Sequence, residues 1–181
     1  NYGDGSKDVV NVIEFYTGSV TSEEKETLKR NARIAYDAFD RDHPEVFWLS
    51  GESRVLLVTT SSSEGESTTA YFVCKNHESS KSFDIRRDDY QTEESIRNVI
   101  AERDSNVDGI IKEAEAKTTD YEKVKYLNEW LTKNNCYNSD LNAAETNYPE
   151  AWECVSALKG STGTQGPVCE GYARAFKVLC D

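Results

Sequence analysis

The hydrophobic pattern of this chain changes its period near Asp88. Before this residue, apolar side chains gather in short stretches rich in β-branched and aromatic residues, such as 55–58 (VLLV) and 68–74 (TTAYFVC), which are typical of strands. After it, they recur every three or four positions, as on one face of a helix. Segregated strands and helices are typical of an α+β protein. We therefore expect an N-terminal α+β accessory region over 1–90 and a mainly helical region over 91–181.

The N-terminal region is predicted to contain one helix and a small antiparallel sheet. Thr21 and Glu24 match a capping box, and apolar residues follow at helical spacing until His43 and Pro44, which predicts a helix over about 22–40. Its buried stripe is expected to be Leu28, Ala32, Ala35 and Phe39. Strands are expected over 9–16, 46–49, 54–60 and 68–74, with the Ser- and Gly-rich 61–67 as a hairpin loop.

The second region is predicted to consist of helices joined by polar loops over 134–148 and 160–167. A long helix begins at Thr92, a second is capped by Asp120, and a short one opens at Pro149. A final helix starts near Cys169 and carries Tyr172, Ala173, Phe176 and Leu179 on its inner face. The second helix is expected to bury Tyr121, Val124, Leu127 and Leu131.

The charge balance excludes several kinds of partner. The chain has 21 Lys and Arg against 33 Asp and Glu, a formal net charge of -12. A phosphate backbone would be repelled, so we expect no nucleic acid. No apolar run approaches the roughly 18 residues of a membrane span, so we expect no transmembrane segment. The cysteines lack the close pairing of a structural zinc site, and we expect neither a metal nor a cofactor.

Five cysteines are present, an odd number that leaves at least one thiol without an intramolecular partner. Cys169 and Cys180 belong to one predicted helix and would lie about 16 Å apart along it, whereas disulfide partners need Cα atoms within about 7 Å. The disulfide pairing of the remaining thiols stays open, namely Cys74, Cys136, Cys154 and Cys180 with other partners.

Cys169 is the candidate for chemistry because of its position in the first turn of a helix. Unpaired backbone N–H groups and the positive end of the helix dipole favour the thiolate there, and the thiolate is the nucleophile. The adjacent Glu170 acts against this effect. An ordinary buried cysteine is the alternative.

Two segments carry a family resemblance. Residues 168–179 (VCEGYARAFKVL), after a Gly-rich loop, resemble the nucleophile segment of the bacterial transglutaminase-like superfamily, and 121–137 (YEKVKYLNEWLTKNNCY) resemble the helix that precedes it. Residues 43–49 (HPEVFWL) are also similar to a segment in the N-terminal region of clostridial surface-protein relatives. The resemblance covers roughly residues 90–181.

The resemblance implies the helical first half of a papain-like core, with Cys169 as the nucleophile. The family's catalytic His and Asp come from a sheet later in the chain, so they are expected beyond Asp181. Gln165 is a possible oxyanion donor, with a plain turn residue as the alternative. His43 and His77 precede the cysteine and are expected to be structural or surface residues.

The expected function is thiol-dependent acyl transfer or amide hydrolysis on a peptide, a protein side chain or a cell-wall peptide, at the surface of a bacterium or outside it. The alternative is a non-catalytic cell-surface binding or adhesion module on the same fold, and a third is an acidic helical domain in which VCEGYA is a coincidence. The pattern around Asn1 and Asp181 suggests a piece of a longer protein, inactive by itself. Phe176 and Leu179 would then lack their cover and promote self-association.

Overall fold

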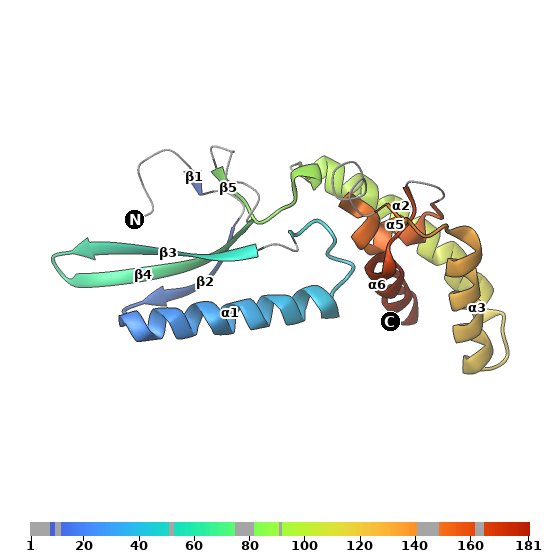
Figure 1. The fold of residues 1–181 in the computed structure, drawn as a ribbon, viewed down its shortest axis with the longest axis horizontal. Helices are drawn as coiled ribbons and strands as arrows, with labels where there is room; N and C mark the ends of the chain where they lie inside the picture. Colours follow the sequence, from blue (N-terminus) through green and yellow to red (C-terminus); the bar gives the residue numbers. More distant parts are fainter. Residues whose placement is uncertain are drawn as a thin grey trace. The chain divides into compact units, whose positions relative to one another are not determined.

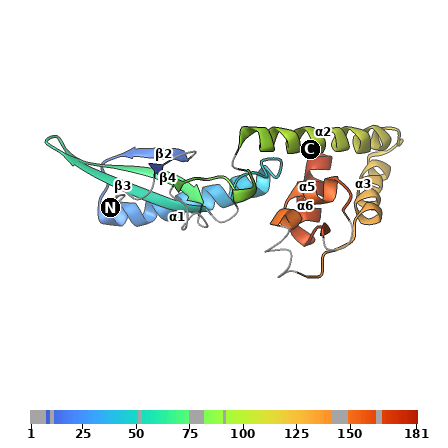
Figure 2. The same ribbon diagram turned by 90° about the horizontal axis from the view of Figure 1, so that it is seen from above.

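The computed structural model describes residues 8–9, 12–50, 53–74, 82–90, 92–140, 149–161 and 165–181. The chain forms two compact units, the first comprising 1–42 and 48–91 and the second comprising 43–47 and 92–181 (Figures 1 and 2). A helix and a small antiparallel sheet occur before Gln91, and the described residues after it contain helices and no strand. The predicted mixed α+β fold class is confirmed.

The first unit contains helix α1 (Ser22–Asp42) and a three-stranded antiparallel sheet of order β2-β4-β3. The helix starts at the predicted capping box, in which the Thr21 backbone N–H donates to Glu24 Oε2 at 2.7 Å and the Glu24 N–H donates to Thr21 Oγ1 at 3.3 Å. The sheet strands are β2 (Ile13–Gly18), β3 (Ser53–Ser62) and β4 (Gly65–Cys74); β1 (Asp8–Val9) and β5 (Ser82–Phe83) form a separate parallel pair, and the 3₁₀ helix η2 covers Asp88–Tyr90.

Three details of the predicted strands are wrong. The single strand over 9–16 is two short strands, and the loop over 61–67 is a tight turn, because β3 and β4 pair as far as Ser62 and Gly65. Gly65 has a φ of 126°, which a glycine adopts readily and which closes this turn. Residues 46–49 are not a strand and contribute one isolated bridge, Leu49 to Arg86, because 43–47 pack in the second unit instead.

The core of the first unit lies between α1 and the sheet. Ala32, Tyr36, Phe72 and Ile85 are buried, and the Phe15 ring stacks on Phe72 with centroids 4.4 Å apart. The predicted helix stripe is correct at Ala32 but not at Ala35 and Phe39, which are exposed. The buried face instead centres on Ala32 and Tyr36, whose hydroxyl donates to the Ser50 carbonyl at 2.8 Å. Tyr36 therefore anchors α1 to the segment that leads into β3.

The described part of the second unit is helical apart from 43–47 and the segments that join its helices. Its helices are α2 (Glu93–Glu115), α3 (Asp120–Asn134), the 3₁₀ helix η3 (Pro149–Trp152), α5 (Cys154–Leu158) and α6 (Cys169–Cys180). Thr92, where the long helix is predicted to begin, is the N-cap of α2 and accepts the Ser95 N–H at 3.1 Å. No helix in the described part of the chain is long and apolar enough to cross a membrane.

The start of α3 differs from the prediction by one residue. Thr119, not Asp120, is the N-cap, because it forms a full capping box with Glu122: the Glu122 N–H donates to Thr119 Oγ1 at 3.2 Å, and Glu122 Oε2 accepts the Thr119 N–H at 3.1 Å. The predicted buried stripe is also shorter, since Leu127 and Leu131 are buried while Tyr121 and Val124 are exposed.

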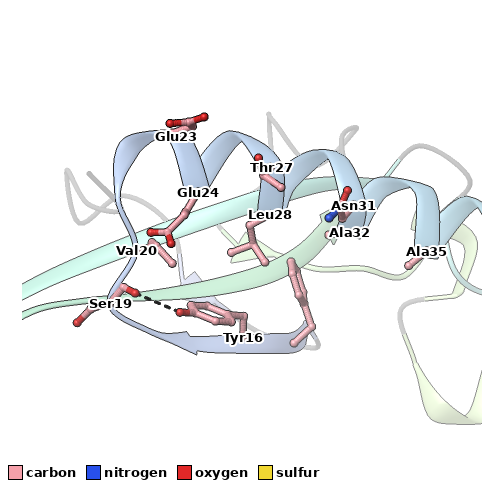
Figure 3. Close-up of a pocket in the computed structure, with 11 residues that line it drawn as sticks. Tyr16, Ser19, Val20, Glu23, Glu24, Thr27, Leu28, Asn31, Ala32 and Ala35 are labelled. Carbon is pink, nitrogen blue, oxygen red and sulfur yellow. Dashed lines mark hydrogen bonds between the residues drawn. The ribbon is translucent and has the colours of Figure 1, made fainter.

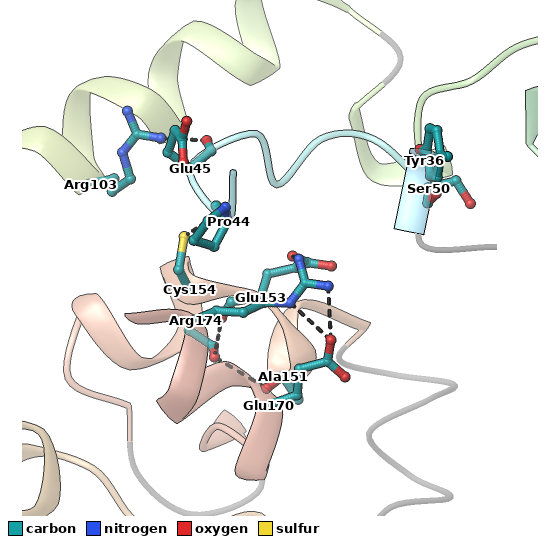
Figure 4. Close-up of polar contacts among 11 residues, drawn as sticks. Tyr36, Pro44, Glu45, Ser50, Arg103, Ala151, Glu153, Cys154, Glu170 and Arg174 are labelled. Carbon is teal, nitrogen blue, oxygen red and sulfur yellow. Dashed lines mark hydrogen bonds and ion pairs between the residues drawn. The ribbon is translucent and has the colours of Figure 1, made fainter. Parts of the chain in front are cut away.

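The segment His43–Phe47 is anchored among the helices of the second unit (Figure 4). Pro44 and Phe47 are almost fully buried. The Arg103 Nη1 group of α2 donates to the Glu45 carbonyl at 2.6 Å, and its guanidinium lies 5.7 Å from the centroid of the Phe47 ring. The Cys154 thiol of α5 donates to the Pro44 carbonyl at 3.1 Å. These contacts explain why this segment packs among helices and does not form a strand.

The apolar face of helix α6 is covered by other elements of the second unit. Ala175 and Leu179 are buried, and Phe176 is partly buried. The expectation that Leu179 lacks cover is therefore wrong, because α6 packs against α5, η3 and α3.

Candidate functional site

Cys169 is the first residue of α6, and it is exposed. The three residues before it, 166–168, are buried and held by backbone hydrogen bonds. The Val168 N–H donates to the Ala151 carbonyl at 3.0 Å, and the Asn138 N–H donates to the Pro167 carbonyl at 3.1 Å. An accessible thiol thus sits directly after a backbone segment that neighbouring elements fix in place.

The first turn of α6 presents unpaired backbone donors beside this thiol. The first hydrogen bond within the helix runs from the Tyr172 N–H to the Val168 carbonyl at 3.1 Å, and Val168 has no side chain that could cap the turn. Within the described residues, nothing accepts the N–H groups of Cys169, Glu170 and Gly171. These groups can stabilise negative charge at the helix start.

Gly171 allows α6 to approach the backbone of η3. A Cβ atom at this position would lie 2.4 Å from the Ala151 carbonyl oxygen, 3.0 Å from Ser156 Oγ and 3.1 Å from Pro167 Cβ. No larger side chain fits without movement of backbone. The glycine in VCEGYA therefore has a packing role that fixes where the first turn of α6 lies.

The charge of Glu170 is balanced by Arg174, one turn further along α6 (Figure 4). Arg174 donates to Glu170 Oε1 through Nη2 at 2.8 Å and Nε at 3.0 Å, and its Nη1 lies 3.3 Å from Glu153 Oε2. The Arg174 and Glu153 side chains are 11% and 7% exposed. Arg174 therefore holds the Glu170 carboxylate in an ion pair at the first turn of α6.

The segment after α3 packs against the first turns of α6. Asn135 is buried and ties this segment to the loop after α5: its Nδ2 group donates to the Ala157 carbonyl at 3.0 Å, and its Oδ1 accepts the Ser161 N–H at 2.8 Å. The Tyr137 ring stacks on Tyr172 with centroids 6.4 Å apart. Tyr172 follows Cys169 by one helical turn, so this aromatic pair lies on the same side of α6 as the thiol. Burial raises the pKa of Tyr172, with a smaller contribution from Cys136.

The other described thiols are placed differently. Cys154 is fully buried, and burial together with the neighbouring Glu153 raises its pKa to about 12. Partial burial and Asp181 raise the pKa of Cys180. Cys136 is exposed, but it lies outside a helix. Cys136, Cys154, Cys169 and Cys180 are all free thiols, and the side chain of Cys74 lies outside the described part of the structure.

No described hydrogen bond or ion pair joins Gln165 or His43, the other predicted site residues that the structure describes, to Cys169. Gln165 is exposed and separated from the cysteine by the buried 166–168. His43 belongs to the second unit, where its Nδ1 lies 2.9 Å from Glu45 Oε1, while His77 lies outside the described residues. The sequence does not predict the contacts of Arg174, Tyr137 and Asn135, because the residues that they contact are distant along the chain or belong to no motif.

Comparison with known proteins finds no match: no family, no curated protein and no solved structure is significantly similar to this chain. Among the described residues, no group of three or more His, Cys, Asp and Glu side chains is arranged to hold a metal ion.

Proposed function

We propose that this chain supplies the nucleophile of a thiol-dependent acyl-transfer or amide-hydrolysis reaction of the transglutaminase-like type, with Cys169 as the attacking residue. The observation that carries the proposal is the exposed Cys169 thiol at the start of α6, beside the unpaired N–H groups of its first turn. The buried alternative thiol, Cys154, has a pKa of about 12 and stays protonated near neutral pH.

In this reaction the Cys169 thiolate attacks a carbonyl carbon, and the first-turn N–H groups face negative charge that develops nearby. The carbon–nitrogen bond then breaks, the amine leaves with a proton, and a thioester forms on Cys169. Transfer of the acyl group to water completes a hydrolysis, and transfer to another amine completes a cross-link. The partner imidazole and carboxylate of the family would move the protons.

Of the two histidines only His43 is described, and its imidazole pairs with Glu45. The proposal therefore predicts acylation of Cys169 by an activated donor, but no sustained turnover by residues 1–181. In this proposal Gln165 takes the supporting role of an oxyanion donor. We assign a peptide, a protein side-chain amide or a cell-wall peptide as the substrate, at the surface of a bacterium or outside it.

A non-catalytic binding module is the second candidate function. The observation that favours it is an open groove in the first unit, between α1 and β2, which lies in a part of the chain that contributes no residue to the Cys169 site. The two functions can be tested separately, because a substitution in the first unit can remove binding and a substitution in the second can remove catalysis.

Acylation by p-nitrophenyl acetate tests the catalytic proposal. The thiolate displaces p-nitrophenolate and becomes an acetyl thioester, which adds one acetyl mass to the protein. We expect a single rapid acetylation, located at Cys169 by peptide mass spectrometry and lost in Cys169→Ser. Cys136→Ser is the matched control, because Cys136 is exposed but, unlike Cys169 and Cys180, lies outside α6. This variant should keep the rapid phase. Rapid acetylation at Cys136, or none at Cys169, would refute the proposal.

A further inference from the structure

A groove of about 600 Å³ lies between α1 and β2 in the first unit (Figure 3). Its volume is in the range of roughly 300–1,000 Å³ that binding sites occupy. Its walls are mostly apolar, with Phe15 and Tyr16 from β2 and Leu28 and Ala35 from α1. Ala35, which the sequence pattern places in the core, instead faces this groove.

The floor of the groove depends on an irregularity in β2. Glu14 pairs with Tyr71 and Tyr16 pairs with Ala70, so Phe15 is an extra residue in the ladder with β4. Such a bulge redirects side chains, and here both Phe15 and Tyr16 line the groove. Phe15 stacks on Phe72, while the Tyr16 hydroxyl donates to the Ser19 carbonyl at 3.3 Å.

Gly18 leaves room for the Tyr16 side chain that lines the groove. A Cβ atom at this position would lie 2.6 Å from the Tyr16 hydroxyl oxygen, so the glycine provides the space in which the Tyr16 ring lies. The groove is therefore formed by specific residues rather than by an accidental gap between two elements.

One edge of β2 borders this groove, and no described strand pairs with that edge. β2 stands at the edge of the three-stranded sheet and pairs with β4 only. Apart from that ladder, no backbone-to-backbone hydrogen bond of Ile13–Gly18 occurs within the described residues. Free N–H and C=O groups of an edge strand are a template for an added strand. Alternate side chains of such a strand would enter the groove beneath α1.

The charges at the groove select the occupant. Glu23 and Glu24, in the first turn of α1, line the end of the groove that is next to the C-terminal end of β2. Glu14 is exposed on β2. The Thr21 N–H and hydroxyl hold the pKa of Glu24 below its usual value, so this carboxylate stays charged. A second copy added antiparallel would bring Glu14 of each chain toward Glu23 of the other, which is repulsive. A cationic segment is complementary.

We propose that this groove binds an extended segment of a partner protein, added as an antiparallel strand to β2, with alternating apolar side chains and a lysine or arginine near its N-terminal end. The polarity follows from the antiparallel direction, which places the start of the added strand beside Glu23 and Glu24. This site is formed by residues of the first unit, whereas Cys169 belongs to the second, so its failure leaves the proposed chemistry untouched.

Fluorescence anisotropy with three synthetic peptides tests the proposal on the intact chain. Each peptide alternates valine and threonine over about eight residues, a usual strand length. One carries two lysines at its N-terminus, one carries them at its C-terminus, and one has N-terminal glutamates instead. We expect the first peptide to bind about tenfold or more tightly than the other two.

The substitution Ala35→Trp fills the groove at an exposed position and should weaken binding of the first peptide about tenfold or more. Asp37→Trp is the matched control, because Asp37 is exposed on the same helix but does not line the groove, and its binding should be unchanged. Circular dichroism checks that both variants fold. Equal binding to Ala35→Trp, or no binding of the first peptide, would overturn the proposal. A dimer seen by sedimentation and lost in Ala35→Trp would overturn it in favour of a second copy.

Discussion

Replacement of Gly171 by alanine should destabilise the second unit by about 2 kcal/mol or more, as expected for an added methyl group that meets close-packed backbone. The new Cβ would lie 2.4 Å from the Ala151 carbonyl oxygen, in a place where α6, η3 and the Pro167 ring already touch. The higher helix propensity of alanine offsets only about 1 kcal/mol of this cost. Urea unfolding, followed by the fluorescence of Trp130 and Trp152 in a Trp48→Phe background, measures the effect.

Gly109→Ala is the matched control, because Gly109 lies within α2 and a Cβ there meets nothing within 4 Å. This variant should gain about 0.5–1 kcal/mol from the lower backbone entropy of its unfolded state. If Gly171→Ala is as stable as Gly109→Ala, the close approach of α6 to η3 is wrong, and so is the position that it gives to Cys169.

Replacement of Phe47 by alanine should destabilise the second unit by about 3–5 kcal/mol, the usual cost of truncating a buried aromatic side chain. Phe47 is 1% exposed and lies under the Arg103 guanidinium, in a segment that separates two elements of the first unit along the chain. The same tryptophan reporters should show the loss, although Phe47 lies 46 residues before the start of α2.

Phe39→Ala is the control for Phe47, since Phe39 is 41% exposed and belongs to the first unit. Its effect on the unfolding of the second unit should stay below about 0.5 kcal/mol, as for most surface substitutions. A loss of less than about 1 kcal/mol in Phe47→Ala would show that 43–47 is not a structural part of the second unit.

The parts of the fold that follow from local interactions could be predicted from the sequence. The capping box at Thr21 and the N-cap at Thr92 involve residues three positions apart, so α1 and α2 begin where the sequence indicates. The position of Cys169 in the first turn of α6 is confirmed for the same reason, because the Gly- and Pro-rich loop ends directly before it. Thr119 was missed in favour of its neighbour Asp120, since both are good capping residues.

The other features depend on contacts between distant residues. Residues 46–49 have strand-forming side chains, but burial of Phe47 and the bond from Arg103 to Glu45 outweigh that propensity. The Arg174 pair with Glu153 spans 21 positions, and no motif indicates it. The bulge at Phe15 depends on the register of β2 against β4, which the sequence of β2 alone does not specify.

The rate at which each thiol of the native protein reacts with limiting iodoacetamide tests the central claim most directly. Peptide mass spectrometry over time gives a separate rate for each cysteine, with Cys169→Ala as the comparison. We predict that Cys169 reacts first and that its loss removes the rapid phase. Cys154 should stay unmodified until the protein unfolds, because its buried thiol has a pKa of about 12. Faster reaction at Cys136 or Cys180, or a rapid phase that persists in Cys169→Ala, would contradict the assignment of Cys169 as the nucleophile.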